Sequence, residues 1–475
     1  MASAQCPSSS PLRLFVDKER NKVVMGEASG DFIDALLSFL TLPLGTIIRL
    51  RLAEVGCINN LYRSVQNLST EVFWNGICKK MLLFPRNPCE KLCQKLRFNV
   101  DDTEPTKGLM CSSCYGLFGV GSEKCVSTFV GANCSSCGNL MDQERNLWSE
   151  RDKYLKGDGV FVRGEGMYLI FDDLTVLQNS ACNTIHQLVQ LGYTDFTKLT
   201  EISPNVGLNQ IMDLLKHALI STSSLTHVFL GREAGGSMSS FTPLLASQNV
   251  CGSGPSFNLR ITVSKSKNKI LYVEAEEDFT DFLLSFLSMP LGATLKLLDA
   301  NVNLGSMQNL YKSVKGLNPS WFGRYRSECP PFSPLLDLKV ASQNGCKKQP
   351  LDICEEESPS YHDTSNLFTK KMTLFEPRCA DGWSEAVGFV RRPSLFAVMD
   401  DLQVTPLTST STVSFLQKLQ VPFNDLEEHN VTIHELEALN LLGASLTSKA
   451  ALTNGLFYLV KKQKEEASTI ITQGF

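Results

Sequence analysis

Two pairs of cysteines have the spacing of metal ligands. Cys111 and Cys114 form one C-x₂-C pair, and Cys134 and Cys137 form a second pair after 19 intervening residues. Structural zinc sites commonly hold the ion with four thiolates in a tetrahedron, and each C-x₂-C pair can turn both sulfurs toward one ion. The spacing predicts one structural Zn²⁺ per chain, held by these four cysteines in a zinc-ribbon-like insertion over about 108–140. Unligated surface thiols are the alternative interpretation.

The expected role of this zinc is structural. A catalytic zinc keeps an open coordination position and usually has a histidine or carboxylate ligand, whereas the nearest histidine, His186, lies well outside the cysteine segment. Gly138 follows the second pair and suits a tight turn beside the metal. Residues 126–130 are expected to form the return strand. The second half of the chain has no C-x₂-C pair, so the site is predicted in the first half only.

Two pairs of adjacent aspartates invite an acid–base or Mg²⁺ interpretation. Asp172-Asp173 and Asp400-Asp401 each follow an apolar run. Neighbouring residues on a strand point to opposite faces, so we expect these pairs to end strands and serve turns without lining a shared pocket. Nucleophile-elbow, phosphate-loop, dinucleotide and zinc-protease motifs are absent from the sequence. The sequence therefore predicts no catalytic or cofactor-binding residues and indicates a non-enzyme. The alternative is an enzyme with a site between the two halves, marked by a cleft converging on Asp172 or Asp400.

A basic stretch at residues 79–97 raises the question of nucleic acid. It contains six Lys or Arg residues and one Glu, and such a cluster can contact phosphates. The whole chain, however, has a net charge of −4, and the cysteine segment itself carries no basic face. A nucleic-acid-associated protein using the ribbon and residues 79–97 is therefore the alternative function, because charge runs are more often solvated surface.

The elements that must position these residues come from an internal repeat. Residues 12–50 and 259–297 align without a gap and share 20 of 39 positions, far above chance, which indicates a duplication. Each copy starts with two alternating runs around a charged turn, typical of a β-hairpin, and continues with an apolar helix. We expect the two copies to superpose, with Phe32 and Phe279 in equivalent buried positions.

The helix boundaries in the repeat are marked by charged residues and prolines. Asp31 and Asp278 are predicted as helix N-caps, and Asp34 and Asp281 as second carboxylates favourable to the helix dipole. A later helical segment, Asn60–Val65, recurs as Asn309–Val314.

A second module is also duplicated, because residues 161–174 resemble residues 389–402. Helical periodicity downstream at 206–214 is expected to recur at 431–439. The sequence therefore predicts an α+β fold with an internal tandem duplication, A–B–A′–B′, in which each A module is a β-hairpin plus helices. The expected boundaries are a disordered N-terminus at 1–10, module A1 at 11–155, module B1 at 156–232, a linker at 233–256, module A2 at 257–385, module B2 at 386–464 and a tail at 465–475.

Length and composition set the remaining expectations. A chain of 475 residues with 43% apolar and 20% charged residues is typical of a soluble globular protein. The N-terminal segment lacks the basic and apolar regions of a signal peptide, and the apolar run near residues 32–44 is too interrupted to span a bilayer. The expected location is intracellular, cytoplasmic or nuclear, with the 16 cysteines mostly reduced. No membrane insertion is expected.

The chain contains the motifs LRLFVDKERNKVV, DFIDALLSFLTLPLGTIIRL, INNLYRSV and DDTEPTK, together with the MDDL-type strand. In these motifs it resembles a plant domain-of-unknown-function family, number six-seven-four. The resemblance covers nearly the whole chain and implies a tandem-duplicated protein without an established activity or catalytic residues. The DDTEPTK motif, at residues 101–107, leads into the cysteine pairs. The corresponding segment of the second half, residues 336–341, has neither the motif nor the cysteine pairs. The leading hypothesis is a non-enzymatic interaction or scaffold protein with an unidentified protein partner.

Overall fold

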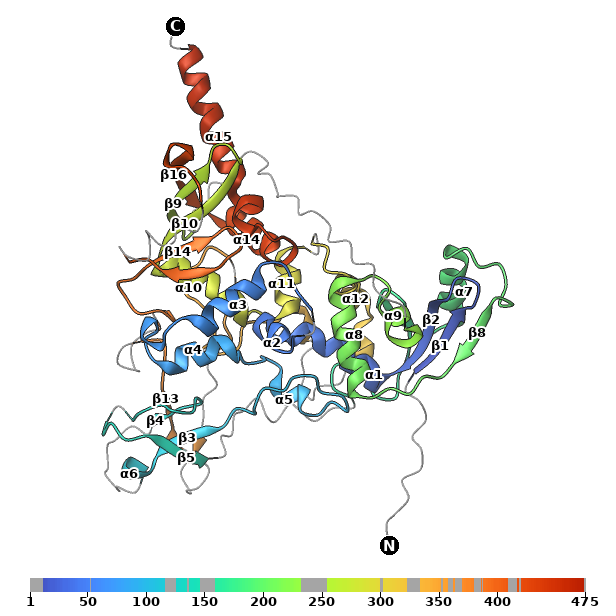
Figure 1. Ribbon diagram of the computed structural model, residues 1–475. Helices are drawn as coiled ribbons and strands as arrows, with labels where there is room; N and C mark the ends of the chain where they lie inside the picture. Colours follow the sequence, from blue (N-terminus) through green and yellow to red (C-terminus); the bar gives the residue numbers. More distant parts are fainter. Residues whose placement is uncertain are drawn as a thin grey trace.

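The protein has a mixed α+β fold with two five-stranded antiparallel sheets on either side of a helical centre (Figure 1). The computed structural model describes residues 12–51, 53–115, 125–134, 136–145, 159–231, 254–299, 302–322, 334–351, 353–357, 362–363, 370–379, 386, 388–408, 417 and 420–473. The segments predicted as the disordered N-terminus and most of the linker lie outside these residues.

The first sheet combines the N-terminal hairpin with strands from much later in the chain. Its order is β7-β6-β2-β1-β8. The strands are β1 Leu12–Asp17, β2 Lys22–Ser29, β6 Met167–Phe171, β7 Val176–Gln178 and β8 Leu199–Ile202. Alternation in β1 places Leu12 and Leu14 in the core and Arg13 in solvent, as a half-buried strand requires.

The second sheet has the corresponding order, β15-β14-β10-β9-β16. Its strands are β9 Phe257–Ser264, β10 Lys269–Glu276, β14 Leu395–Met399, β15 Val404–Pro406 and β16 Leu426–Ile433. Even the irregularity of the hairpin recurs, because the register skips Val24 in one sheet and Leu271 in the other. The predicted helix at 431–439 is wrong at its start, because Val431 and Ile433 belong to strand β16 and the helix begins only at Glu435.

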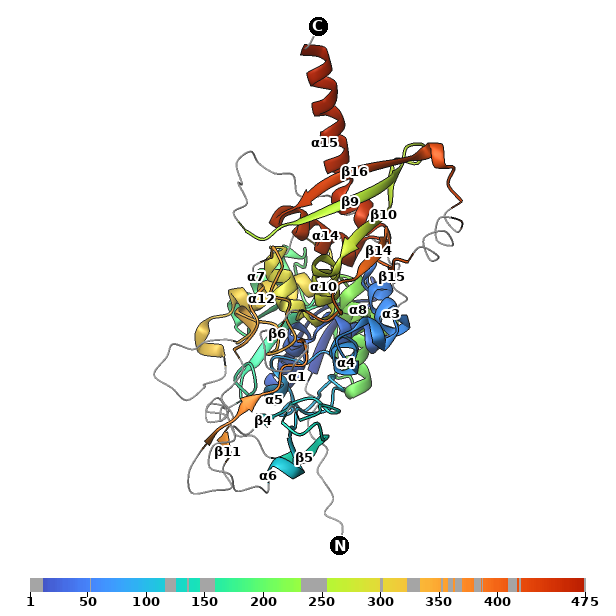
Figure 2. The same ribbon diagram turned by 90° about the vertical axis from the view of Figure 1, so that its left-hand side faces the viewer.

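Most of the helices lie between the two sheets (Figure 1). In the first half they are α1 Gly30–Ser38, α2 Leu44–Arg49, α3 Ile58–Asn67, α4 Gly76–Leu83, α5 Glu90–Cys93, α6 Ser112–Tyr115, α7 Ala181–Gln190, α8 Leu208–Ile220 and α9 Ser224–Leu230. In the second half they are α10 Glu277–Ser285, α11 Leu291–Leu297, α12 Met307–Gly316, α14 Glu435–Thr447 and α15 Ala451–Gln473. Helices α6, α7 and α15, in contrast, lie at the periphery of the molecule, and α15 extends beyond the sheets in both views (Figures 1 and 2).

Both repeated segments form the predicted hairpin followed by a helix, and Phe32 and Phe279 are fully buried. The predicted N-caps are wrong, because α1 is preceded by Ser29 and α10 by Glu276. Asp31 instead lies inside the first turn of α1. The helices stop as expected before a proline, since residues preceding proline favour extended backbone.

Each half places a helix against the sheet of the other half. In α3, the Ser64 hydroxyl accepts a hydrogen bond of 2.9 Å from the Val404 amide of β15. In α12, the Ser313 hydroxyl accepts the matching bond of 2.9 Å from the Val176 amide of β7. Figure 1 shows the blue α3 beside the second sheet. The two halves therefore exchange helices reciprocally and do not pack as separate units.

The two halves meet at a short antiparallel contact around Pro43 and Pro290. The Leu44 amide donates to the Met289 carbonyl, and the Leu291 amide donates to the Leu42 carbonyl, both at 2.9 Å. One apolar core runs through α1, α2, α10 and α11 into both sheets. Among the described residues, no helix is long and apolar enough to cross a membrane.

Candidate metal centre

Three of the four predicted cysteine ligands converge. Cys111 ends strand β3 (Gly108–Cys111), and Cys134 and Cys137 lie in the loop before β5 (Met141–Arg145). Their sulfurs all lie within 4.8 Å of one another, and Cys111 Sγ is 3.4 Å from Cys137 Sγ. Cys111 and Cys134 are buried and Cys137 is exposed. Cys114 lies in α6, which follows Cys111 directly, and its side chain is outside the described residues.

The backbone around the second pair forms a tight turn closed by its own hydrogen bonds. The Gly138 amide donates to the Cys134 carbonyl, and the Cys134 amide donates to the Asn139 carbonyl, both at 2.7 Å. Gly138 has φ +74°, a conformation that glycine adopts without steric cost. The Asn139 side chain also donates to the Ser113 hydroxyl at 2.9 Å. The two cysteine segments are thus tied together independently of any ion.

This arrangement fits a metal ion. Zn–S bonds of about 2.3 Å in a tetrahedron separate the sulfurs by slightly less than about 4 Å. The 3.4 Å contact and the 4.8 Å limit bracket that separation. Thiolates are soft ligands that favour zinc over magnesium or calcium. Cys111, Cys134 and Cys137 therefore form a group that can hold a metal, and Cys114 is placed by sequence to complete it.

The insertion carrying these cysteines, here called the cysteine insertion (residues 108–145), is built differently from the expectation at 126–130. Strand β3 pairs antiparallel with β5, from Gly108–Arg145 to Cys111–Met141. The short strand β4 (Cys125–Val126) pairs in parallel with β13 (Thr373–Leu374) of the second half, and Ser127, directly after it, forms an antiparallel bridge with Leu109 of β3. Phe129 and Val130 follow in a turn and form no strand. The expected return strand is therefore present only at its start, and the longer partner of β3 is β5.

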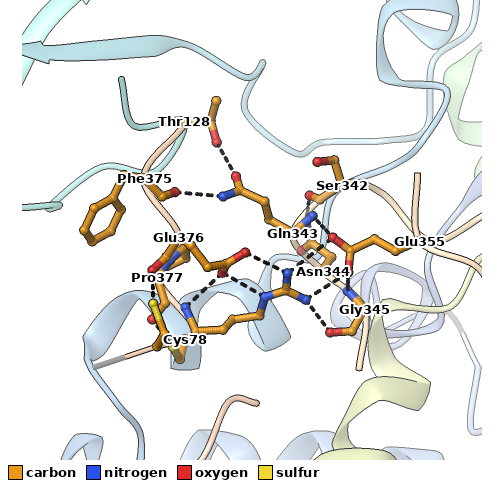
Figure 3. A network of polar contacts seen from close by, with 12 residues as sticks. Cys78, Thr128, Ser342, Gln343, Asn344, Gly345, Glu355, Phe375, Glu376 and Pro377 are labelled. Carbon is orange, nitrogen blue, oxygen red and sulfur yellow. Dashed lines mark hydrogen bonds and ion pairs between the residues drawn. The ribbon is translucent and has the colours of Figure 1, made fainter. Parts of the chain in front are cut away.

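The base of the cysteine insertion is held by polar contacts to both halves. Arg86 binds the Thr128 carbonyl and hydroxyl and lies over the Phe129 ring, 3.7 Å from its centroid. The Thr128 hydroxyl in turn donates to the Gln343 side chain at 3.2 Å. Gln343 belongs to a network of polar contacts (Figure 3), in which its backbone amide donates to Glu355, a partner of buried Arg378.

Arg378 has only 3% of its side chain exposed and binds two carboxylates. Its guanidinium forms two bonds to Glu376, of 2.9 and 2.8 Å, and two to Glu355, of 3.0 and 3.3 Å. The carboxylates beside it raise the pKa of Arg378 even though burial opposes its charge. Glu355 also accepts the Gln343 and Gly345 amides. Each nitrogen of the Arg378 guanidinium thus has a partner within the protein, which is the pattern of a structural anchor.

Much of the basic stretch at residues 79–97 is also used internally. The Lys79 ammonium donates to the Gln66 and Leu68 carbonyls at the end of α3, at 2.9 and 2.5 Å. Arg86 anchors the cysteine insertion, and Arg97 pairs with Asp31 at 3.6 Å. The Lys79 and Arg86 charges, which are held by hydrogen bonds, are less available to phosphates.

The segment DDTEPTK is held against the first half. Arg49 pairs with Asp102 at 2.6 Å, and the Asn87 amide donates to Asp101 at 3.1 Å. The second half keeps one of these contacts although its sequence has diverged. Lys296, which aligns with Arg49, pairs with Asp337 at 2.8 Å.

The strand-end aspartates serve the turns as expected, but one pair also lines a cavity. Asp172 is buried and accepts the Thr226 amide and hydroxyl at 2.8 and 2.9 Å. Asp400 accepts the Thr453 amide in the same way at 2.8 Å. Asp172 and Asp173 both line a cavity of about 330 Å³, so the expectation of no shared pocket is wrong for this pair. Strand alternation does not apply there, because β6 ends at Phe171 and both aspartates lie in the turn.

The alternative of an enzyme requires a cleft between the two halves. The contact between them is apolar. A void of only about 10 Å³ lies there, and its lining is exclusively apolar, including Ile47, Leu219, Leu291 and Leu446. The larger cavity at Asp172 is lined by first-half residues alone.

Sequence reasoning missed two buried carboxylates that organise the fold. Asp34 accepts the Val160, Phe161 and Val162 amides, each at 2.8 Å. Asp281 accepts the Phe389 and Val390 amides at 2.8 and 3.0 Å. Burial raises the pKa of Asp34 to about 6 and that of Asp281 to about 7, although the amides oppose the rise. The available signal was an aspartate at the same aligned position of two helices that are buried along most of their length.

Fold and site together define a mixed α+β protein with a cysteine group able to hold a metal ion. The chain belongs to the DUF674 family, described as a protein of unknown function, whose family model matches residues 8–436. No curated protein and no solved structure matches the chain. The description of this family assigns no biochemical activity to its members.

Proposed function

We propose that this protein is a non-enzymatic interaction protein in which a structural zinc ion shapes the cysteine insertion for a protein partner. The observation that carries the proposal is the convergence of Cys111, Cys134 and Cys137 at the free end of an insertion whose base is anchored. Zinc held by Cys114 together with these three would fix the end of the insertion, as structural zinc does in small loop-rich segments.

The surface of the insertion favours a protein partner over nucleic acid. Val130 and Leu140 are 65% and 51% exposed beside the cysteine turn, and exposed apolar side chains near a rigid turn suit protein contacts. Lys107 is paired with Glu144 at 2.9 Å, which leaves this cation neutralised. The nucleic-acid alternative has less support because the basic stretch is also engaged internally.

We also infer that the chain arose by tandem duplication and that only the first half acquired the cysteine insertion. The gapless sequence match, the corresponding strand orders and the shared bulge support this inference. The apolar contact between halves gives no support to a catalytic site there.

Metal analysis of the full-length protein tests the zinc. About one zinc per chain is expected, and Cys134→Ser should lose most of it because three thiolates hold the ion less tightly. Cys125→Ser is the matched control, since Cys125 lies in β4 outside the converging group. A metal-free wild-type protein, or equal zinc loss in the two variants, would refute the site.

A second comparison tests the interaction separately from the metal. Crosslinked complexes of the wild type are compared with those of the double variant Val130→Asp and Leu140→Asp, after confirming that its zinc content is unchanged. Specific loss of one protein partner in the variant would support the proposal. Identical partner profiles would reject this surface as the binding site.

A further inference from the structure

The cavity of about 330 Å³ beside the first sheet has the size of a small-molecule site. It lies where the β1–β2 turn, the end of β6, the end of α7 and the loop before α9 meet. The residues that matter for its chemistry are Arg20, Lys22, Phe171, Leu191, Tyr193 and Thr222.

The acidic groups in this cavity are already satisfied by the protein. Asp172 accepts two hydrogen bonds from Thr226. Asp173 accepts the Thr175 amide at 3.0 Å and the Asn309 side chain at 3.1 Å. A cationic ligand would have to compete with these bonds, so the carboxylates are poorly placed to recognise one.

The basic groups, in contrast, keep donors available to a ligand. The Lys22 ammonium is 3.8 Å from Asp172, beyond hydrogen-bond distance, and makes no hydrogen bond to any described residue. The Arg20 guanidinium is 3.7 Å from Asp17, which accepts a stronger bond of 2.8 Å from the Tyr193 hydroxyl. Both basic side chains are about half exposed or more, with exposed fractions of 49% and 69%.

An apolar wall faces these cations. Val24 and Phe171 are 6% and 7% exposed and pack with Leu188 on the outer face of the sheet. Leu191, at the end of α7, lines the cavity and is 47% exposed. A ligand body covering Leu191 would bury apolar surface now open to water, which favours binding.

We propose that this cavity binds a small organic anion, with its carboxylate or phosphate head on Lys22 and Arg20 and its apolar body against Phe171 and Leu191. The Thr222 hydroxyl is a further donor to the head. The proposal is independent of the metal site, which lies in a different part of the chain.

Titration calorimetry of the full-length protein with four probes tests this site. The probes are benzoate, phenyl phosphate, inorganic phosphate and the neutral benzyl alcohol. Benzoate or phenyl phosphate, or both, should bind. The one that binds more tightly shows whether the site prefers a carboxylate or a phosphate head. Benzyl alcohol should bind about tenfold more weakly because it lacks the charge-assisted bonds. Inorganic phosphate should also be weaker than phenyl phosphate, since it has no apolar body.

Lys22→Met should weaken the aromatic anion about tenfold, whereas Lys269→Met, at the matching turn of the second sheet, should leave its affinity unchanged. If Lys22→Met fails to fold, Arg20→Met replaces it, because that side chain is the more exposed. Equal binding of benzyl alcohol, equal effects of the two lysine variants, or no saturable binding of either aromatic anion up to about 10 mM would overturn the proposal.

Discussion

Asn60 in α3 of the first half holds the turn at Asp401 of the second half. Its side-chain amide donates to the Asp401 carbonyl at 3.1 Å and to the carboxylate at 3.2 Å. Asn309 in α12 makes the same pair of bonds to Asp173, at 3.3 and 3.1 Å. Each half therefore supplies the contact that closes the strand-end turn of the other, so the sheets and helices of both halves should fold cooperatively.

These two asparagines should contribute similarly and independently to stability. We expect Asn60→Ala and Asn309→Ala each to lower the free energy of unfolding by about 1–2 kcal/mol, because each removes two side-chain hydrogen bonds to the turn of the other half. The double variant should show the sum, since the two sites share no partner. Chemical denaturation measures both. Asn67→Ala, at an exposed position of α3, is the control. Marked non-additivity would contradict independent sites.

The exchange of helices predicts that the halves stay together without a covalent link. A specific protease site placed between residues 240 and 246 should be cleaved without separating the fragments, because α3 and α12 remain packed across the halves. Gel filtration with light scattering should give the mass of the intact chain, and about 6 M guanidinium should release the fragments. Two separate folded fragments under native conditions would contradict the exchange.

Local patterns in the sequence were sufficient to predict the strands and helices of the repeat and three of the cysteines that converge. The alternation around Leu12 and Leu14 and the apolar helix around Phe32 encode burial through their periodicity, and the C-x₂-C spacing encodes convergence of the sulfurs. The spacing of Val431 and Ile433 fits a strand as well as a helix, which explains the misplaced helix start.

The relationship between the halves could not be read from local patterns. A helix with an apolar face requires a partner surface, but its periodicity does not say which sheet supplies it. For the same reason Asp34 looked like a charge placed for the helix dipole, whereas its partners are amides more than 100 residues away in sequence.

The buried Asp34 predicts an unusual dependence of stability on pH. Burial raises its folded-state pKa to about 6 from 3.8, so the folded protein holds the proton more tightly than the unfolded chain. This contribution is fully present below about pH 4 and is lost as the pH rises through about 6. The stability of the wild type relative to Asp34→Asn should therefore fall over that interval, by up to about 3 kcal/mol.

Denaturation of the wild type and the variant at several pH values measures this difference. Asp31→Asn provides the control, because this residue is an exposed carboxylate of the same helix and should give no comparable change. A wild type that gains stability relative to Asp34→Asn as the pH rises would show that the three amide bonds outweigh burial.

The Arg378 network predicts a large effect on stability when its central side chain is replaced. Arg378→Met removes the cation between Glu355 and Glu376 and leaves two largely buried carboxylates facing each other. We expect a loss of about 2–3 kcal/mol in the free energy of unfolding, discounted for the partial exposure of both acids. Arg378→Lys should lose less, because it keeps the charge but not the two-sided geometry.

The same variant should loosen the cysteine insertion, since Gln343 links the network to Thr128. Hydrogen exchange should speed up at Val126 and Thr128, while the amides of β1 and β2 keep their protection. Adding Glu355→Gln to Arg378→Met should restore part of the stability by removing one unpaired charge. If the added substitution restores nothing, charge repulsion is not the cause of the loss. If exchange at Val126 is unchanged, the network does not anchor the insertion.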